Sequence, residues 1–144
     1  MRKTTVYESH GEEDTFALGL KLGSDARPGQ VYCLNGDLGV GKTVFTKGFA
    51  KGLGIDEVIS SPTFTIKKSY EEGRIPLCHF DVYRIEDEDE MEEVGFREEF
   101  YGDGVCLVEW AENIRDVLPE DAVEVTIEKD LEKGFDYRRI TVKR

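Results

Sequence analysis

Residues Gln30 to Lys51 read QVYCLNGDLGVGKTVFTKGFAK, and this stretch decides the fold. Val31 to Leu34 form a short apolar run of the kind that makes a buried strand, and apolar side chains recur at helical spacing after Lys42. Between these segments, Gly36 to Thr43 match G-x-x-x-x-G-K-T, the pattern of a phosphate-binding loop. The sequence therefore predicts a strand, a phosphate loop and a helix that runs from Lys42 to about Leu53.

The loop residues predict a binding site for a nucleoside triphosphate with Mg²⁺. Gly36, Gly39 and Gly41 allow a tight turn with backbone N–H groups facing inward, and the positive end of the helix dipole lies at the same point. We expect Lys42 to reach the β- and γ-phosphates and the Thr43 hydroxyl to coordinate Mg²⁺. The residues expected around the phosphates are Gly36, Asp37, Leu38, Gly39, Val40, Gly41, Lys42, Thr43 and Val44.

The length and the remaining pattern indicate the fold class. The 144 residues suit a single domain, residues 1–144. Short strands alternate with helical stretches, so we expect an α/β fold of the P-loop NTPase kind, with three layers around a mainly parallel central sheet. Two pairs of strand-like runs joined by short turns, within 65–83 and 121–142, predict antiparallel hairpin additions to that sheet.

Charge and composition narrow the classes of function. The formal net charge of −12 argues against a protein that wraps DNA or RNA by itself, because affinity for phosphate backbones comes from clustered Lys and Arg. The first residues contain no apolar signal core and no segment approaches the length of a membrane span, so we expect a cytoplasmic protein with no membrane partner. Cys33, Cys78 and Cys106 lie in apolar runs and are expected to be small core residues.

Two carboxylates follow strand-like runs and are candidates for the second half of an NTPase site. Asp81 lies at or near the end of the strand expected from Leu77 to Tyr83, and Glu109 follows the unbroken apolar run from Val105 to Val108. The chemistry needs a carboxylate at the tip of a strand next to the phosphate-loop strand, where it binds Mg²⁺ or aligns the attacking water. Either acid could instead turn out to solvent, and spacing alone does not decide which one contacts the metal.

The roles of three further residues are less specific: Thr63 and Trp110 each have two interpretations, and His79 has a structural one. Thr63 lies in the hydroxyl-rich segment Ser60 to Thr65, which is either a loop that enters a strand or a segment that senses the γ-phosphate. Trp110, the only tryptophan, either fills the core or stacks beside the nucleotide. His79 is expected to be a structural histidine that faces away from Phe80, because no cluster with metal-ligand spacing accompanies it.

An acidic run from Glu86 to Glu90 is expected to open a helix that continues from Met91 to Val94. Acids at that position suit the positive end of the helix dipole. The run is either a solvated helix start or an acidic docking surface for a basic partner.

Five segments together resemble the TsaE (YjeE) family, bacterial ATPases needed to make the threonylcarbamoyladenosine modification of tRNA. The matching segments are LNGDLGVGKT at 34–43, SPTFT at 61–65, HFDVYR at 79–84, EEVGF at 92–96 and LVEW at 107–110. Their order and separations also match, which makes the resemblance far more specific than the loop alone. The N-terminal strand and helix and the C-terminal hairpin match only in general character.

The resemblance implies a small P-loop ATPase that binds ATP with Mg²⁺. At the matching positions, the resemblance assigns phosphate and metal binding to Lys42 and Thr43. It assigns Asp81 and Glu109 to an acidic pair around Mg²⁺ and the attacking water. Thr63 then lies in a switch-like loop.

The resemblance also implies partners. In the family, ATP turnover acts on a complex of TsaB and TsaD, which modifies an adenosine in the tRNA anticodon loop, and hydrolysis is slow without these partners. The chain is then an energy-coupling subunit that meets tRNA only indirectly, with Trp110 beside its nucleotide site. This agrees with the acidic charge.

The phosphate loop is also compatible with other functions. A small-molecule kinase also needs an acceptor pocket and usually an arginine-bearing lid, and this chain is short for both. A GTP-dependent switch lacks support because no N-K-x-D segment is present. A nucleotide-binding module without hydrolysis would leave the pair of Asp81 and Glu109 without a role.

Overall fold

The computed structural model describes residues 2–37, 39–60 and 66–144. In this part of the chain the strands are β1 (Thr4–Ser9), β2 (Val31–Asn35), β3 (Lys67–Tyr70), β4 (Leu77–Asp81), β5 (Val105–Glu109), β6 (Val123–Lys129) and β7 (Arg138–Lys143). The α-helices are α1 (Glu12–Asp25), α2 (Lys42–Gly52), α3 (Glu90–Glu93) and α4 (Phe96–Phe100). Two 3-10 segments, η1 (Ala111–Val117) and η2 (Leu131–Lys133), complete the elements.

All the strands named above form one sheet in the order β1-β7-β6-β2-β5-β4-β3. The four central strands, β6, β2, β5 and β4, are parallel to one another. Antiparallel pairs add β3 at one edge and β7 with β1 at the other. The predicted α/β fold, with a mainly parallel centre and antiparallel hairpins, is confirmed.

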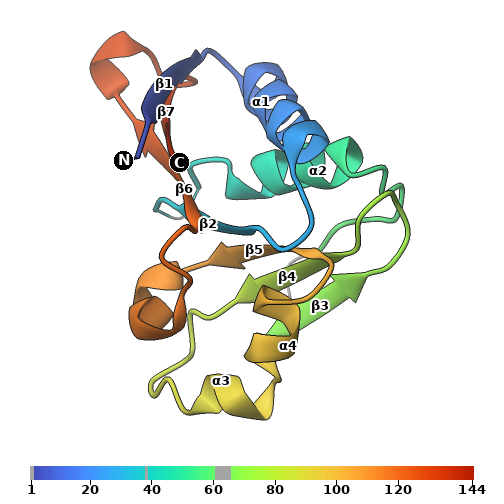
Figure 1. The fold of residues 1–144 in the computed structure, drawn as a ribbon. Helices are drawn as coiled ribbons and strands as arrows, with labels where there is room; N and C mark the ends of the chain where they lie inside the picture. Colours follow the sequence, from blue (N-terminus) through green and yellow to red (C-terminus); the bar gives the residue numbers. More distant parts are fainter. Residues whose placement is uncertain (1, 38, 61–65) are drawn as a thin grey trace.

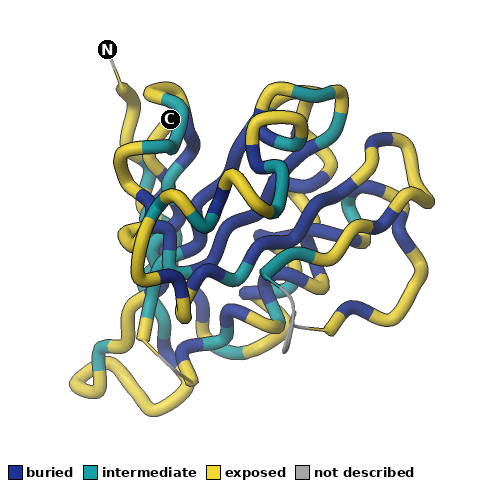
Figure 2. The backbone as a smooth tube through the Cα atoms, turned by 90° about the horizontal axis from the view of Figure 1, so that it is seen from below, coloured by how far each residue is buried: buried dark blue, intermediate teal, exposed yellow. Residues whose placement is uncertain are grey.

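Helices cover the sheet on both faces and make three layers. Helices α1 and α2 lie on one face, and α3, α4 and η1 lie on the other (Figure 1). A core cluster that includes Phe45 and Phe49 fills the α1–α2 side, and a second cluster that includes Phe80 and Phe100 fills the opposite side. Strands β2, β4 and β5 are consequently buried along nearly all of their length (Figure 2), whereas β6 alternates between buried and more exposed side chains before its end. The mostly apolar sequences of β2, β4 and β5 follow from this burial on both faces.

Helices α1 and α2 approach each other through glycines. A Cβ atom on Gly48 would overlap the carbonyl oxygen of Phe16, and one on Gly23 would overlap the carbonyl oxygen of Phe49. Backbones can lie this close only where no side chain intervenes. The contact fixes α2 against α1, and therefore fixes the loop that precedes α2.

Two predicted elements differ in extent from the observed ones. Strand β4 ends at Asp81 and does not reach Tyr83, because the Asp81 carboxylate accepts the Tyr83 backbone N–H at 3.1 Å and turns the chain. The acidic run does not open the helix directly, since α3 begins only at Glu90. Gly95, in the left-handed region at φ 71°, then separates α3 from α4.

Cys33, Cys78 and Cys106 are buried free thiols, as predicted. Within the described ranges, no helix combines the length and the apolar character that crossing a membrane requires.

Candidate functional site

The phosphate loop has the backbone geometry that its glycines allow. Gly36, Gly39 and Gly41 have φ values of 151°, 80° and 107°, all in the region that side chains disfavour. At Gly36 a Cβ would also lie 2.7 Å from the carbonyl oxygen of Ile127 and 2.8 Å from Cγ2 of Val40. Gly36 therefore cannot be replaced without moving either the loop or β6.

Hydrogen bonds hold the loop between α2 and β7. Gly41 is the N-cap of α2, and its carbonyl oxygen accepts the Phe45 backbone N–H at 3.0 Å. On the other side, the Arg138 guanidinium donates through Nε to the carbonyl oxygen of Val40 at 2.9 Å. Sequence reasoning missed Arg138, because 98 residues separate it from Val40. The N-terminus of α2, with its positive dipole end, is thereby fixed at the mouth of the loop.

Lys42 is the first residue of α2 and is 8 % exposed. Its Nζ lies 4.3 Å from the centroid of the Trp110 ring, a cation–π distance. Trp110 itself is half-buried and packs its ring 4.9 Å from that of Tyr83. Trp110 has φ 62°, the one positive φ among the non-glycine residues that the structure describes. Such backbone conformations cluster at functional sites. Trp110 contacts Lys42 at the phosphate loop, and its half-buried side chain also packs against the second core cluster.

The two candidate carboxylates lie side by side at the ends of β4 and β5. Asp81 pairs with Glu109 across these parallel strands, and Glu109 pairs with Leu34 of β2 on its other side. Glu109 is therefore on the strand next to the phosphate-loop strand, whereas Asp81 is one strand further away. Side chains alternate along a strand, and Leu77 and Leu107 face the core beneath α1 and α2. Asp81 and Glu109 consequently face the side on which Lys42 lies.

Glu109 is only 8 % exposed and contacts a histidine. His79 Nε2 lies 2.7 Å from Glu109 Oε2. His79 is 1 % exposed and faces away from Phe80, as predicted, but it is bonded to a candidate site carboxylate and not to a purely structural partner. Its strand partner is Leu107, two residues before Glu109, so the contact runs diagonally across β4 and β5.

Two predicted site residues, Leu38 and Thr63, lie outside the described residues. The other predicted site residues are placed where they could contact a nucleotide bound with Mg²⁺. Thr43 is exposed at the start of α2, and Asp81 is half-buried at the mouth of the site. Among the described residues no group of three or more His, Cys, Asp or Glu side chains could hold a metal ion by itself. Mg²⁺ bound with a nucleotide needs fewer protein ligands, because phosphate oxygens and water fill the remaining positions.

Hollows flank the phosphate loop on two sides. One, of about 530 Å³, is lined by Gly36, Asp37 and Val40 together with residues 126–129 of β6. A smaller one, of about 230 Å³, lies between the loop, the start of α1 and the β6–β7 hairpin, where Phe135 is exposed. Both offer room for the parts of a nucleotide beyond its phosphates.

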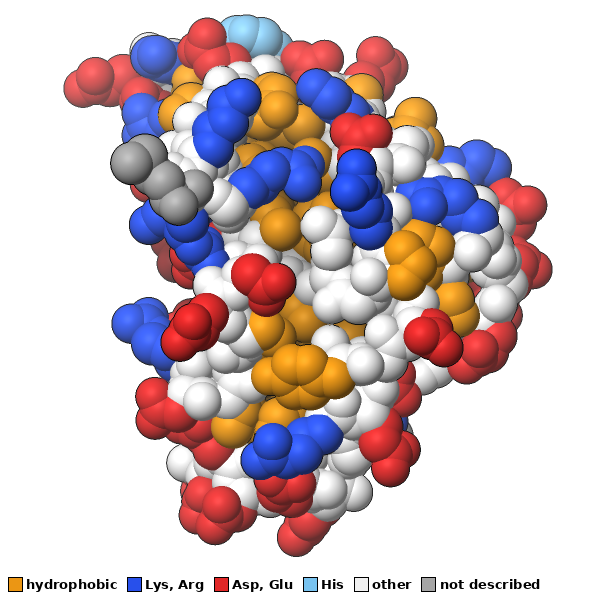
Figure 3. All heavy atoms as spheres, in the orientation of Figure 1, with side chains coloured by type: hydrophobic (Ala, Val, Ile, Leu, Met, Phe, Trp, Pro, Cys, Tyr) orange, Lys and Arg blue, Asp and Glu red, His pale blue; other side chains and the backbone are white. Residues whose placement is uncertain are grey.

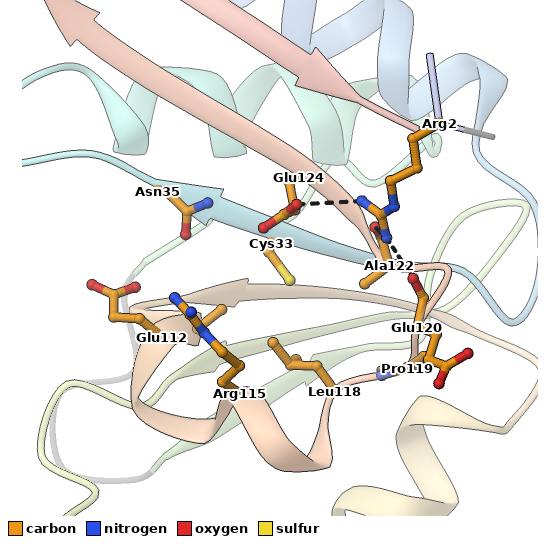
Figure 4. A pocket seen from close by; sticks show the side chains of 11 residues that line it. Arg2, Cys33, Asn35, Glu112, Arg115, Leu118, Pro119, Glu120, Ala122 and Glu124 are labelled. Carbon is orange, nitrogen blue, oxygen red and sulfur yellow. Dashed lines mark hydrogen bonds and ion pairs between the residues drawn. The ribbon is translucent and has the colours of Figure 1, made fainter. Parts of the chain in front are cut away.

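A hollow of about 560 Å³ lies elsewhere, between η1 and strands β2 and β6 (Figure 4). It is on the sheet face opposite to α2. Arg2 crosses it and donates to Glu124 at 3.3 Å and to the carbonyl oxygen of Ala122 at 2.9 Å. Cys33 also lines it, but burial raises the pKa of this thiol to about 12, so it is not a nucleophile at neutral pH. This hollow shares no phosphate-loop residue.

Comparison with known proteins identifies the family. The family model described as threonylcarbamoyl adenosine biosynthesis protein TsaE matches residues 9–140. A tRNA threonylcarbamoyladenosine biosynthesis protein TsaE from Bacillus subtilis is 51 % identical over 139 residues, which cover 96 % of this chain and 85 % of that protein. The protein of the same name from Treponema pallidum is 43 % identical over 119 residues, 83 % of this chain and 87 % of that protein.

A solved structure agrees with this result. The crystal structure of YdiB from Bacillus subtilis superimposes with a TM-score of 0.85 at 43 % sequence identity, over 99 % of this chain and 86 % of that one. The phosphate loop, the parallel sheet centre and these matches lead to one conclusion: the chain belongs to the TsaE family of tRNA threonylcarbamoyladenosine biosynthesis, with a P-loop NTPase fold.

Proposed function

We propose that this protein is an ATPase that hydrolyses ATP with Mg²⁺ and couples hydrolysis to the TsaB–TsaD complex. One observation carries the proposal: the cation of Lys42 and the carboxylates of Asp81 and Glu109 converge on one face of the sheet, at the carboxyl ends of neighbouring parallel strands. In open α/β sheets this is where ligands bind. A site that only bound nucleotide would not require a buried carboxylate beside the phosphate loop.

Each residue has a distinct part in the proposed reaction. The backbone N–H groups of the loop and Lys42 bind the phosphates, and the Thr43 hydroxyl and the acidic pair hold Mg²⁺ and the attacking water. Mg²⁺, when bound, neutralises charge that develops on the β- and γ-oxygens. Glu109 is placed to orient the water, since it is on the strand next to β2 and one of its oxygens is already bonded to His79.

The family and the charge of the chain support the proposed partners. TsaE relatives are named for tRNA threonylcarbamoyladenosine biosynthesis. This chain carries a net charge of −12, which disfavours unaided binding to tRNA, so a partner must hold the RNA. Asp and Glu side chains rim the lower end of the molecule, where α3 and α4 lie (Figure 3). This acidic end is the candidate docking surface for TsaB–TsaD.

The experiment that tests the proposal is steady-state ATP hydrolysis by the purified protein with Mg²⁺, alone and with TsaB, TsaD and tRNA. GTP serves as the nucleotide control, and Lys42→Ala serves as the site control. We expect a low basal rate that the partners raise, with no turnover in the variant. Transfer of phosphate to a small acceptor, with no response to the partners, would instead identify a kinase.

A further inference from the structure

The contact between His79 and Glu109 suggests a role for a histidine that no phosphate-loop pattern identifies. The two residues are 30 positions apart in the chain and belong to different strands. Both side chains lie on the α2 face of the sheet. His79 is one strand-repeat deeper than the carboxylates at the strand ends, so it lies behind Glu109, on the side away from the loop.

The chemistry of the pair fixes which atom donates. With the Glu109 carboxylate as the acceptor, we assign the proton that lies between the two residues to Nε2 of His79. Nδ1 is buried and has no hydrogen-bond partner among the residues that the structure describes. The imidazole ring therefore donates from Nε2 to Glu109 Oε2. These two atoms lie 2.7 Å apart, a short distance typical of a charge-assisted hydrogen bond.

A carboxylate on a strand end otherwise rotates about its side-chain bonds. Binding Oε2 from behind limits that rotation and leaves Oε1 as the oxygen that can turn toward the loop. Preorganised groups contribute to catalysis because they do not have to be ordered during the reaction. The donor also compensates for part of the cost of keeping an ionised carboxylate 8 % exposed.

We infer that His79 is a positioning residue, which orients Glu109 for its action on the attacking water; the inference rests on the proposed ATPase function. His79 does not touch nucleotide in this scheme. It acts through Glu109, so its loss should lower turnover and leave nucleotide affinity unchanged.

The test compares two substitutions at one position. His79→Leu removes the donor and replaces the imidazole with an apolar side chain that suits a buried position. His79→Gln retains an N–H donor. We expect kcat for ATP to fall by roughly 10- to 100-fold in His79→Leu, the range for loss of a residue that supports a catalytic group. KM and the dissociation constant for ATP should stay at the parent values. His79→Gln should recover part of kcat.

A neighbouring substitution controls for packing. Cys78→Ala also removes a buried side chain from β4, but on the opposite face of the sheet. It should retain kcat even where it lowers the free energy of unfolding. If His79→Leu and His79→Gln both turn over ATP at the parent rate, or if His79→Gln loses as much kcat as His79→Leu, the positioning role is wrong. Normal turnover in Glu109→Gln would instead refute the assignment of Glu109 and with it this part of the proposed function.

A spectroscopic measurement tests the contact without turnover. In the parent protein, ¹H–¹⁵N correlation spectra of labelled histidine should show a proton on His79 Nε2 that exchanges slowly with water. In Glu109→Ala that signal should shift or broaden, because its acceptor is gone. An unprotonated Nε2 in the parent would overturn the inference, whatever the kinetic result.

Discussion

The ammonium group of Lys42 lies 4.3 Å from the centre of the Trp110 ring, so the cation of the phosphate loop is in contact with an aromatic face. Electrostatic attraction between a cation and a ring of this kind is worth about 0.5–2 kcal/mol. If Lys42 binds the β- and γ-phosphates, its charge must move relative to the indole. The tryptophan next to Glu109 then reports on the occupancy of the loop.

This relationship predicts a fluorescence change. Trp110 is the only tryptophan, so emission excited selectively from tryptophan, and not from the six tyrosines, reports on this site alone. We expect Mg²⁺–ATP to change the intensity or wavelength of Trp110 emission, with a midpoint equal to the calorimetric dissociation constant. Lys42→Ala should weaken ATP binding by roughly 10- to 100-fold, the loss expected for a hydrogen bond to a charged group. Saturation by ATP with no change in emission would show that Lys42 and Trp110 keep their contact.

Glu109→Gln tests the proposed role of the buried carboxylate. Gln keeps the size of the side chain and removes its charge and basicity. ATP hydrolysis should fall by roughly 10²- to 10⁴-fold, the usual contribution of a general base, while ATP affinity is largely retained. Glu98→Gln, at an exposed acid of α4 on the sheet face opposite to α2, is the matched control and should hydrolyse ATP normally.

The parts of the fold that could be predicted are those encoded locally. The phosphate loop, the helix after it and the hairpins each depend on consecutive residues, and all are present in the structure. Asp81 and Glu109 could be placed at strand ends because apolar runs precede them. The contact of His79 with Glu109 and that of Arg138 with Val40 join residues 30 and 98 positions apart, so they depend on strand order, which no local pattern specifies.

The glycines of α1 and α2 are a second feature that the sequence did not reveal. From the sequence alone, a glycine within a helix is expected to destabilise that helix, since Gly lowers helix stability by roughly 1 kcal/mol relative to Ala. Here the missing side chain is what allows the helices to approach each other.

Gly48→Ala should therefore destabilise the protein, in spite of the better helix propensity of Ala. The new Cβ would overlap the Phe16 carbonyl oxygen, and overpacking of this kind costs roughly 1–3 kcal/mol. Urea unfolding measures the change. Gly11→Ala is the control, because Gly11 has an extended φ of 167° and nothing lies within 4 Å of its Cβ position. A Gly48→Ala variant as stable as the parent would mean that the helices can separate at little cost.

Reversing charge at the acidic end should weaken association with TsaB–TsaD. Glu86 and Glu93 are exposed on the segment that contains α3. Lys at either position should cost up to about 1 kcal/mol of binding free energy for each exposed ion pair that is lost, with no change in ATP affinity. Glu132→Lys, in η2 of the β6–β7 hairpin, controls for net charge. Equal effects of the three substitutions would indicate a general charge effect and no local docking surface.

The contacts of Glu8, in β1, predict that the stability of the protein depends on pH. The Tyr137 hydroxyl donates to Glu8 Oε2 at 2.8 Å and Lys133 Nζ lies 3.7 Å from the same oxygen. The hydrogen bond, and then the nearby ammonium, lower the pKa of Glu8 from its ordinary value of 4.5. A carboxyl group whose pKa is lower in the folded state stabilises the protein above its unfolded pKa, and that stabilisation disappears as pH falls through the folded pKa.

Tyr137→Phe removes the donor and should therefore lower the free energy of unfolding at pH 7. The difference from the parent should shrink as the pH falls below 4.5 and vanish once Glu8 is protonated in both states. Urea unfolding between pH 7 and pH 2 measures both limits, and Glu132→Gln, at an exposed acid of the same hairpin, should show no such convergence. A difference between Tyr137→Phe and the parent that stayed constant over this range would assign the effect of Tyr137 to packing, because only the bond to an ionised Glu8 is lost on protonation.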